Sequence, residues 1–105
     1  MATAYLMVRV QLTDPTIRER FDRWYRDEHL PDAARLFHAE KAWRFWARTD
    51  PPLHVAVYRF PDIDTLRRNT RQEVIGSLIA EFDRSWPTGT TRTREVLELA
   101  GEWQP

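Results

Sequence analysis

The sequence predicts an α+β fold of the ferredoxin-like type, in which a four-stranded antiparallel sheet carries two helical regions on one face. Two observations support it: four short stretches are typical of strands, the first of which alternates clearly with a period of two residues, and two stretches show the apolar spacing of helices. Their order along the chain is β-α-β-β-α-β, which is the order of the split βαβ unit. A length of 105 residues favours a single domain over 1–105.

The first predicted strand, Ala4–Leu12, places leucine and valine on one face and mostly larger or polar residues on the other. Asp14 and Pro15 then predict a helix start, because aspartate caps free N–H groups and proline suits the first helical position. An apolar stripe follows at positions 17, 21 and 24. Pro31 is expected to end or bend this helix, with a short helical continuation over residues 32–37.

The central part of the chain predicts a hairpin. Strands are expected over Lys41–Arg48 and Leu53–Phe60, joined by a turn at residues 50–52. A second helical region starts near Pro61, and its clearest pattern runs from position 75 to position 86. The last strand is predicted over Arg92–Ala100, followed by a tail over residues 101–105.

Composition narrows the possible functions. Sixteen basic residues balance sixteen acidic ones, which argues against nucleic acid or an anionic membrane as the main partner. No run approaches the ~18 apolar residues of a membrane span and no signal peptide is evident, so a cytoplasmic location is expected.

The chain has no cysteine, no H-x-x-x-H or H-E-x-x-H spacing and no glycine-rich phosphate loop, so we expect neither a metal nor a cofactor. Haem held by a histidine is the minor alternative.

Both faces of the predicted strands carry large apolar side chains, but two helices can cover only one face. The other face would expose an apolar patch in a monomer. The sequence therefore predicts a homodimer formed through the sheet face.

The run from Phe21 to Pro31, FDRWYRDEHLP, resembles the W-Y-x-x-E-H-x-P motif of the dimeric α/β-barrel superfamily, in particular its EthD-like branch. The stretch 52–60 is similar to the aromatic third strand of the same group. This resemblance implies two ferredoxin-like sheets paired into a barrel, with a pocket between sheet and helices. Activities among its members include cofactor-free oxygenation, lactone isomerisation, polyketide cyclisation and haem chemistry.

The resemblance also points to His29, because EthD-type proteins and methylmuconolactone isomerases place a histidine near the end of the first helix. Those isomerases use a cysteine as well, which this chain lacks. From its residue type, His29 is either a general acid or base, or a histidine that bonds the last helix carbonyls.

Glu28 is predicted to point inward, because about 100° per residue places it within the apolar stripe of the first helix. A carboxylate there is either a general acid or base with a raised pKa or the partner of Arg9 or Arg44. Fraying before Pro31 could instead turn it outward.

The remaining site candidates come from the strands and the aromatic residues. His54 and Tyr58 share one face of the third strand, which is directed either toward the helices or toward the dimer partner. Trp24, Tyr25 and Trp46 are expected to frame a flat apolar ligand, with Arg44 as a polar contact.

Two functions fit these features. The first is a small cofactor-independent enzyme that acts on an apolar oxygenated molecule by proton transfer or oxygenation. Its catalytic residues would be His29, Glu28, Tyr58 and His54. The second is a non-catalytic ligand-binding or accessory dimer with the same pocket.

Overall fold

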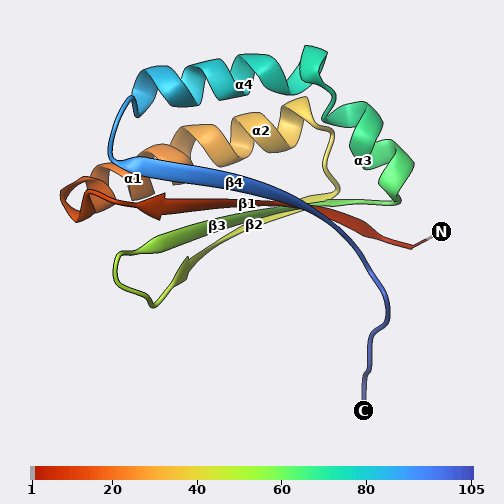
Figure 1. The fold of residues 1–105 in the computed structure, drawn as a ribbon. Helices are drawn as coiled ribbons and strands as arrows, with labels where there is room; N and C mark the ends of the chain where they lie inside the picture. The colour runs from red at the N-terminus through yellow and green to blue at the C-terminus, as the bar shows by residue number, and fades with distance from the viewer. Residues whose placement is uncertain (1) are drawn as a thin grey trace.

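The computed structural model describes residues 2–105 and confirms the predicted fold: one antiparallel sheet carries all the helices on one face (Figure 1). The strands are β1 (Ala4–Leu12), β2 (Lys41–Ala47), β3 (Leu53–Phe60) and β4 (Thr90–Glu98). They lie in the order β2-β3-β1-β4, with every neighbouring pair antiparallel. The bounds of β1 and β3 match the prediction, whereas β4 begins and ends two residues earlier.

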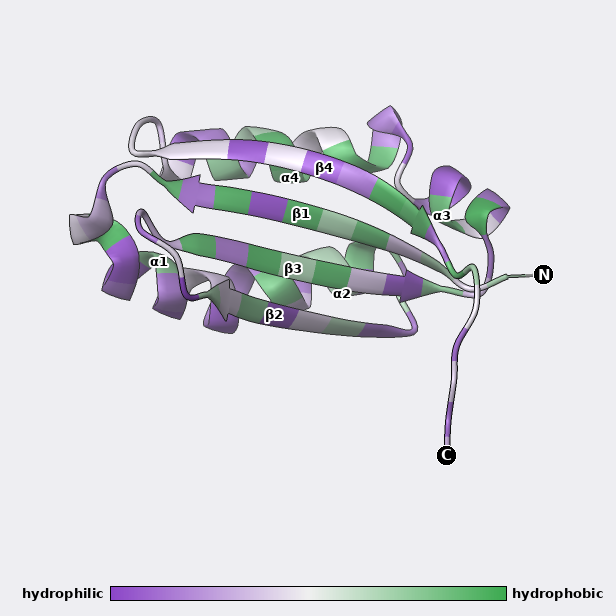
Figure 2. Ribbon diagram, turned by 60° about the horizontal axis from the view of Figure 1, so that its bottom comes forward, coloured by the Kyte–Doolittle hydropathy of each residue, from purple (hydrophilic) through white to green (hydrophobic). Residues whose placement is uncertain are grey.

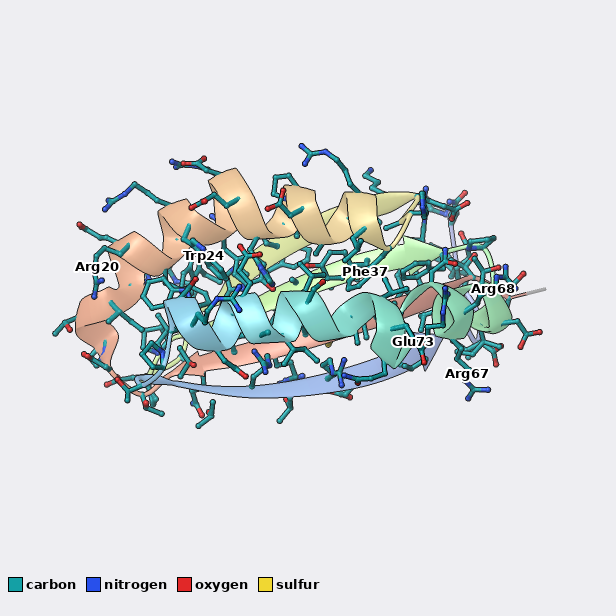
Figure 3. All side chains as sticks on the ribbon, turned by 90° about the horizontal axis from the view of Figure 1, so that it is seen from above. Arg20, Trp24, Phe37, Arg67, Arg68 and Glu73 are labelled. Atoms are coloured by element: carbon teal, nitrogen blue, oxygen red, sulfur yellow. The ribbon has the colours of Figure 1, made fainter. Side chains whose placement is uncertain are left out.

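The helices form two rows above the sheet. The first row consists of a 3-10 turn η1 (Pro15–Ile17), α1 (Arg18–Trp24), a π-helical turn η2 (Tyr25–His29) and α2 (Leu30–Leu36). The second row consists of α3 (Ile63–Asn69) and α4 (Gln72–Ser85). Figure 3 shows Trp24 and Phe37 in the space between the two rows. Within residues 2–105, no helix is long and apolar enough to cross a membrane.

Local capping starts both rows where the sequence predicts. The Thr16 backbone N–H donates to the Asp14 carboxylate over 3.0 Å, and Pro15 occupies the first turn. The Thr65 N–H donates to Asp62 over 2.7 Å at the start of α3. Each cap satisfies an N–H group that would otherwise lack a partner.

The first helical row does not end at Pro31. Instead, the turn before it widens: the Leu30 N–H donates to the carbonyl of Tyr25, five residues back. Proline lacks an N–H and its ring clashes with the carbonyl four residues earlier, so a widened turn accommodates Pro31 without breaking the helix. Buried residues consequently recur every four positions, at Ile17, Phe21, Tyr25, His29, Ala33 and Phe37.

The two faces of the sheet differ sharply. The face under the helices is buried, with Leu6 and Val10 of β1 beside Ala56, Tyr58 and Phe60 of β3. The opposite face, turned toward the viewer in Figure 2, carries Tyr5, Met7, Trp43, Phe45, Val55 and Val57. None of these open-face side chains is buried, and Phe45 is 53% exposed. The predicted two-sided apolar pattern is therefore present, with one side uncovered in a single chain.

The apolar stripes predicted for the two helical regions form much of the core. Phe21, Ile75, Leu78 and Phe82 are buried between the helices and the sheet. Trp24 and Ile79 pack against that core but remain partly accessible. The accessible positions lie beside a small pocket in this layer.

Candidate active site

A narrow pocket of about 40 Å³ lies between the sheet and the two helical rows. Its lining is mainly apolar, with polar groups from five residues: two on η2, one on β3 and two on β4. The lining residues are Leu6, Val8, Tyr25, His29, Ala33, Phe37, Tyr58, Ile75, Leu78, Ile79, Phe82, Arg92 and Arg94. We call this region the His29 pocket.

His29 is the central polar group of this pocket. Its side chain is only 8% exposed because the π-helical turn directs it toward the core. The imidazole stacks on Trp24, with ring centres 4.6 Å apart and planes 18° apart, and its Nδ1 is buried without a hydrogen-bond partner among residues 2–105. Burial, assisted by the nearby Arg92 guanidinium, lowers the pKa of His29 to about 4. The ring is therefore neutral near pH 7 and can accept a proton.

Two tyrosines add hydroxyl groups to the same pocket. Tyr25 and Tyr58 are almost fully buried. Burial raises the pKa of Tyr25 to about 12, and burial likewise raises the pKa of Tyr58 well above its usual range. The Tyr58 hydroxyl is close enough to affect Tyr25, but the Tyr25 hydroxyl has no partner with regular hydrogen-bond geometry. Both side chains remain protonated and can serve as hydrogen-bond donors.

The fourth strand supplies the positive charge of the pocket. Arg92 forms an ion pair with Asp83 at 3.3 Å, and its guanidinium lies 4.4 Å from the centre of the Phe82 ring. Arg94 lies two residues further along the same strand face and lines the pocket as well. These two arginines are the only charged residues that line it within residues 2–105.

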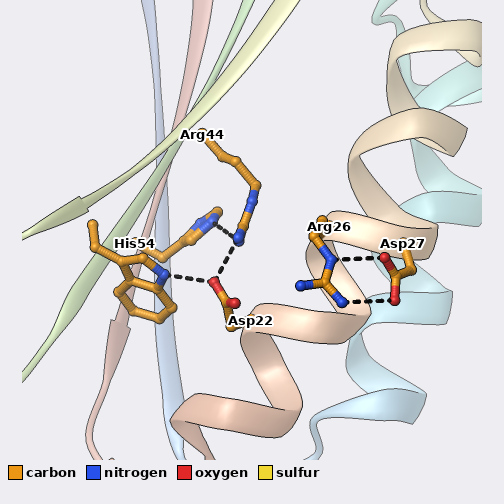
Figure 4. Close-up of polar contacts among 6 residues, drawn as sticks. Asp22, Arg26, Asp27, Arg44 and His54 are labelled. Atoms are coloured by element: carbon orange, nitrogen blue, oxygen red, sulfur yellow. Dashed lines mark hydrogen bonds and ion pairs between the residues drawn. The ribbon is translucent and has the colours of Figure 1, made fainter.

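A second polar group lies beneath α1 and is closely paired. Asp22 accepts hydrogen bonds from Arg44 Nη2 over 2.5 Å and from Trp46 Nε1 over 2.7 Å (Figure 4). Arg44 Nη1 lies 3.2 Å from Nε2 of His54, which is fully buried on the helix-facing side of β3. Burial, together with Arg44, lowers the pKa of His54 to about 3. We call these four residues the Asp22 network.

The inward orientation predicted for Glu28 is wrong. Its side chain is exposed, and it forms no ion pair with any part of residues 2–105. Neither predicted partner binds it, since Arg44 pairs with Asp22 and Arg9 pairs with Glu95. The π-helical turn adds a residue to this part of the helix, so His29 takes the inward place that a regular helix would give Glu28.

The structure divides the other predicted site residues between the two regions. Tyr25, His29 and Tyr58 line the pocket, and Trp24 supports His29 from the side. Arg44, Trp46 and His54 belong to the Asp22 network and do not line the pocket. His54 is separated from it by the Tyr25 ring, whose centre is 4.2 Å away. The alternatives left open for His54 and Tyr58 are thus decided: both face the helices.

Sequence reasoning missed three residues with charge in these regions. Arg92 and Arg94 alternate along the last strand, and this period-two pattern could have placed both on one face. Asp22 gave no local signal, because only the fold brings it to Arg44. Residues 2–105 contain no cluster of three or more side chains suited to a metal ion.

Comparisons with known proteins reveal similarity in structure alone. No protein-family model and no curated protein sequence matches the chain. A dimeric ferredoxin-like protein from an uncultured marine organism matches with a TM-score of 0.73 and 13% identity, over 98% of this chain and 100% of that one. SnoaB, a cofactor-independent oxygenase from Streptomyces nogalater, matches with a TM-score of 0.65 and 14% identity, over 100% and 99% of the two chains.

An EthD family protein from Bacillus halodurans also matches, with a TM-score of 0.64 and 12% identity, over 90% of this chain and 97% of that one. At such low identity the likeness establishes the fold and leaves the activity open. The structure thus agrees with the resemblance in the first helix: this chain has the fold of the dimeric ferredoxin-like proteins, EthD-type members among them.

Proposed function

We propose that this protein is a cofactor-independent enzyme that moves a proton on an apolar, oxygen-bearing small molecule bound in the His29 pocket. The observation that carries the proposal is the buried, neutral imidazole of His29, which lines an apolar pocket and whose Nδ1 has no partner in residues 2–105. Buried polar atoms in folded proteins are nearly always paired, so an unpaired one beside a cavity is suited to a ligand. The fold similarity to a cofactor-independent oxygenase supports this class of activity.

The polar groups of the pocket suit proton abstraction. His29 would take a proton from an acidified C–H or O–H group of the ligand, and Trp24 would hold the ring in place by stacking. The hydroxyls of Tyr25 and Tyr58 would donate to the ligand oxygen on which negative charge develops. The resulting anion would stabilise the imidazolium beside it. This attraction would raise the pKa of His29 above the value of about 4 that burial gives it without a ligand.

The pocket must widen to admit such a ligand. A volume of about 40 Å³ holds only a few water molecules. Ile79 on α4 and Arg94 on β4 line it and are not fully buried, so their side chains can move at modest cost. Ligand binding is therefore expected to displace these side chains before it disturbs the buried tyrosines.

The assembly we propose is a homodimer formed through the open face of the sheet. The exposed Phe45 lies on that face, and an uncovered apolar sheet favours association with a second copy. The tail after β4 leaves the sheet on the side opposite the helices (Figure 1) and carries Trp103, which is 82% exposed. Light scattering at micromolar concentration tests the proposal, and a stable monomer would refute it.

A non-catalytic binding dimer is the second candidate. The low pKa of His29 favours this second candidate, because a base with a pKa of about 4 abstracts a proton poorly unless the ligand itself is acidic. In this alternative the pocket would bind a similar molecule without changing it.

Anthrone is a suitable test compound because it is apolar and its methylene protons are acidified through conjugation to a ketone. The enzyme proposal predicts faster exchange of these protons for deuterium in D₂O, measured by NMR without oxygen. His29→Ala should abolish the acceleration, whereas Glu28→Gln, which changes an exposed neighbour, should retain it. Oxygen uptake in air would then separate an oxygenase from an isomerase or cyclase. Saturable binding without faster exchange would support the binding protein instead.

A further inference from the structure

Arg92 and Arg94 occupy an unusual position in the fold. In the register of the sheet, Arg92 pairs with Val10 and Arg94 with Val8, so both arginines lie on the face covered by the helices. Arg94 is exposed and the Arg92 side chain is 24% exposed, so both guanidinium groups reach water at this edge of the sheet while their stems lie along the pocket. The strand thus places two cations at a layer that β1 fills with apolar side chains.

The charge of these arginines is incompletely matched. Arg92 contacts Asp83, whose side chain is 64% exposed, and an ion pair so accessible to water is weak. Arg94 forms no ion pair with any group in residues 2–105. No carboxylate from these residues lines the pocket, and its histidine is neutral. An apolar cavity with two arginines and no acid is suited to a negatively charged ligand.

We infer that the ligand of the His29 pocket carries a carboxylate, which binds to Arg94 and Arg92 on the β4 side of the pocket. A guanidinium binds a carboxylate through two parallel hydrogen bonds, and the apolar lining would hold the hydrocarbon part of the same molecule. The ligand class is therefore an aromatic or alicyclic carboxylic acid. This inference rests on the proposed ligand site, but it requires no turnover.

The test compares 2-naphthoate with 2-naphthamide, which has nearly the same shape without the charge. Calorimetric titration should show the wild-type protein binding naphthoate at least about tenfold more tightly, as expected for charge-assisted hydrogen bonds. Arg94→Gln should weaken naphthoate binding about tenfold or more and change naphthamide binding less than about twofold. Arg94→Lys keeps the positive charge but cannot donate two parallel hydrogen bonds to one carboxylate. It should therefore give an intermediate loss of naphthoate affinity.

Arg84→Gln is the matched control. Arg84 is an exposed residue at the end of α4 that does not line the pocket, so its removal changes the net charge equally without touching the ligand. Thermal melting would verify that each variant is folded. Equal affinity for acid and amide, an equal loss in Arg84→Gln, or no saturable naphthoate binding at millimolar concentration would overturn the inference. Carboxylate-selective binding by a protein that accelerates proton exchange neither on anthrone nor on an anthrone bearing a carboxylate would instead refute only the enzymatic function.

Discussion

The Asp22 network and the His29 pocket both lie against the first helical row, but they differ in how fully their charged groups are paired, although each also holds a histidine whose Nδ1 is buried without a partner in residues 2–105. In the network, the Asp22 carboxylate is matched by Arg44 and Trp46 through two short hydrogen bonds. In the pocket, Nδ1 of His29 is buried without a partner in residues 2–105, and Arg94 forms no ion pair with any carboxylate of those residues. Matched charges fix α1 on the sheet, whereas unmatched groups around a cavity are free to bind a ligand.

Aromatic side chains lie between the two regions and contact residues of both, and we call them the aromatic wall. The Tyr25 ring lies between the two buried histidines, with its centre 4.2 Å from His54 and 4.9 Å from His29. Phe21 packs against His54 and Tyr25 at 5.4 and 5.5 Å, respectively. Removal of this wall should affect both regions, whereas polar substitutions should affect one at a time.

Phe21→Ala is expected to have the largest effect. Phe21 is fully buried, and large-to-small aromatic changes in a core typically cost about 3–5 kcal/mol. Because a domain of this kind has roughly 5–15 kcal/mol of stability in total, the variant should be close to unfolding. Chemical denaturation measures the loss. Leu36→Ala, at a position that is 41% exposed, is the control and should cost far less. A loss below about 1 kcal/mol for Phe21→Ala would contradict the burial of this ring between the helices and the sheet.

Asp22→Asn should weaken the network and leave the pocket intact. The change removes the charge that Arg44 and the Trp46 N–H bind, and we expect a loss of about 1–3 kcal/mol because the pair is only partly exposed. Naphthoate affinity should change less than about threefold, since none of these side chains lines the pocket. Asp27→Asn, which breaks an exposed pair with Arg26, is the matched control. An equally large loss in both variants would remove the distinction between the two regions.

The two buried histidines should make stability depend on pH. Their folded pKa values, about 4 for His29 and about 3 for His54, lie below the ordinary value of 6.5. Between these limits the unfolded chain binds more protons, so stability is complete above about pH 6.5 and is lost as the pH falls toward 4. His29 alone should contribute about 2–3 kcal/mol to this loss. Melting of His29→Gln across this range should show a shallower dependence, and an unchanged slope would show that His29 is not buried as a neutral ring.

The sequence predicted strands better than it predicted the site. The bounds of β1 and β3 were clear because one face of each strand is buried and apolar, which fixes an alternating pattern. The bounds of β4 were shifted because this strand is mostly exposed and has polar residues on both faces. The pairing of Asp22 with Arg44 depends on contacts between residues 22 positions apart, which no local pattern encodes.

The error at Glu28 has a specific physical cause. A helical wheel assumes about 100° for every residue, but the π-helical turn from Tyr25 to His29 rotates less per residue. The wheel therefore placed Glu28 in the buried stripe one position too early, while His29 occupies that stripe in the structure. Pro31 was the available signal, since it was correctly identified as a local disturbance but was expected to end or bend the helix.

Glu28→Gln should have the smallest effect of all. Its carboxylate is exposed and forms no ion pair with the rest of residues 2–105, so substitutions there should change stability by less than about 0.5 kcal/mol. Naphthoate binding should also be unchanged, because Glu28 does not line the pocket. The neighbouring His29→Gln replaces a buried ring that stacks on Trp24, and it should lose both stability and ligand affinity. Thermal melts and titrations of the two variants compare adjacent positions on opposite sides of one helical turn. If Glu28→Gln proved the more damaging of the two, the π-helical turn would be misplaced and the inward residue would be the glutamate.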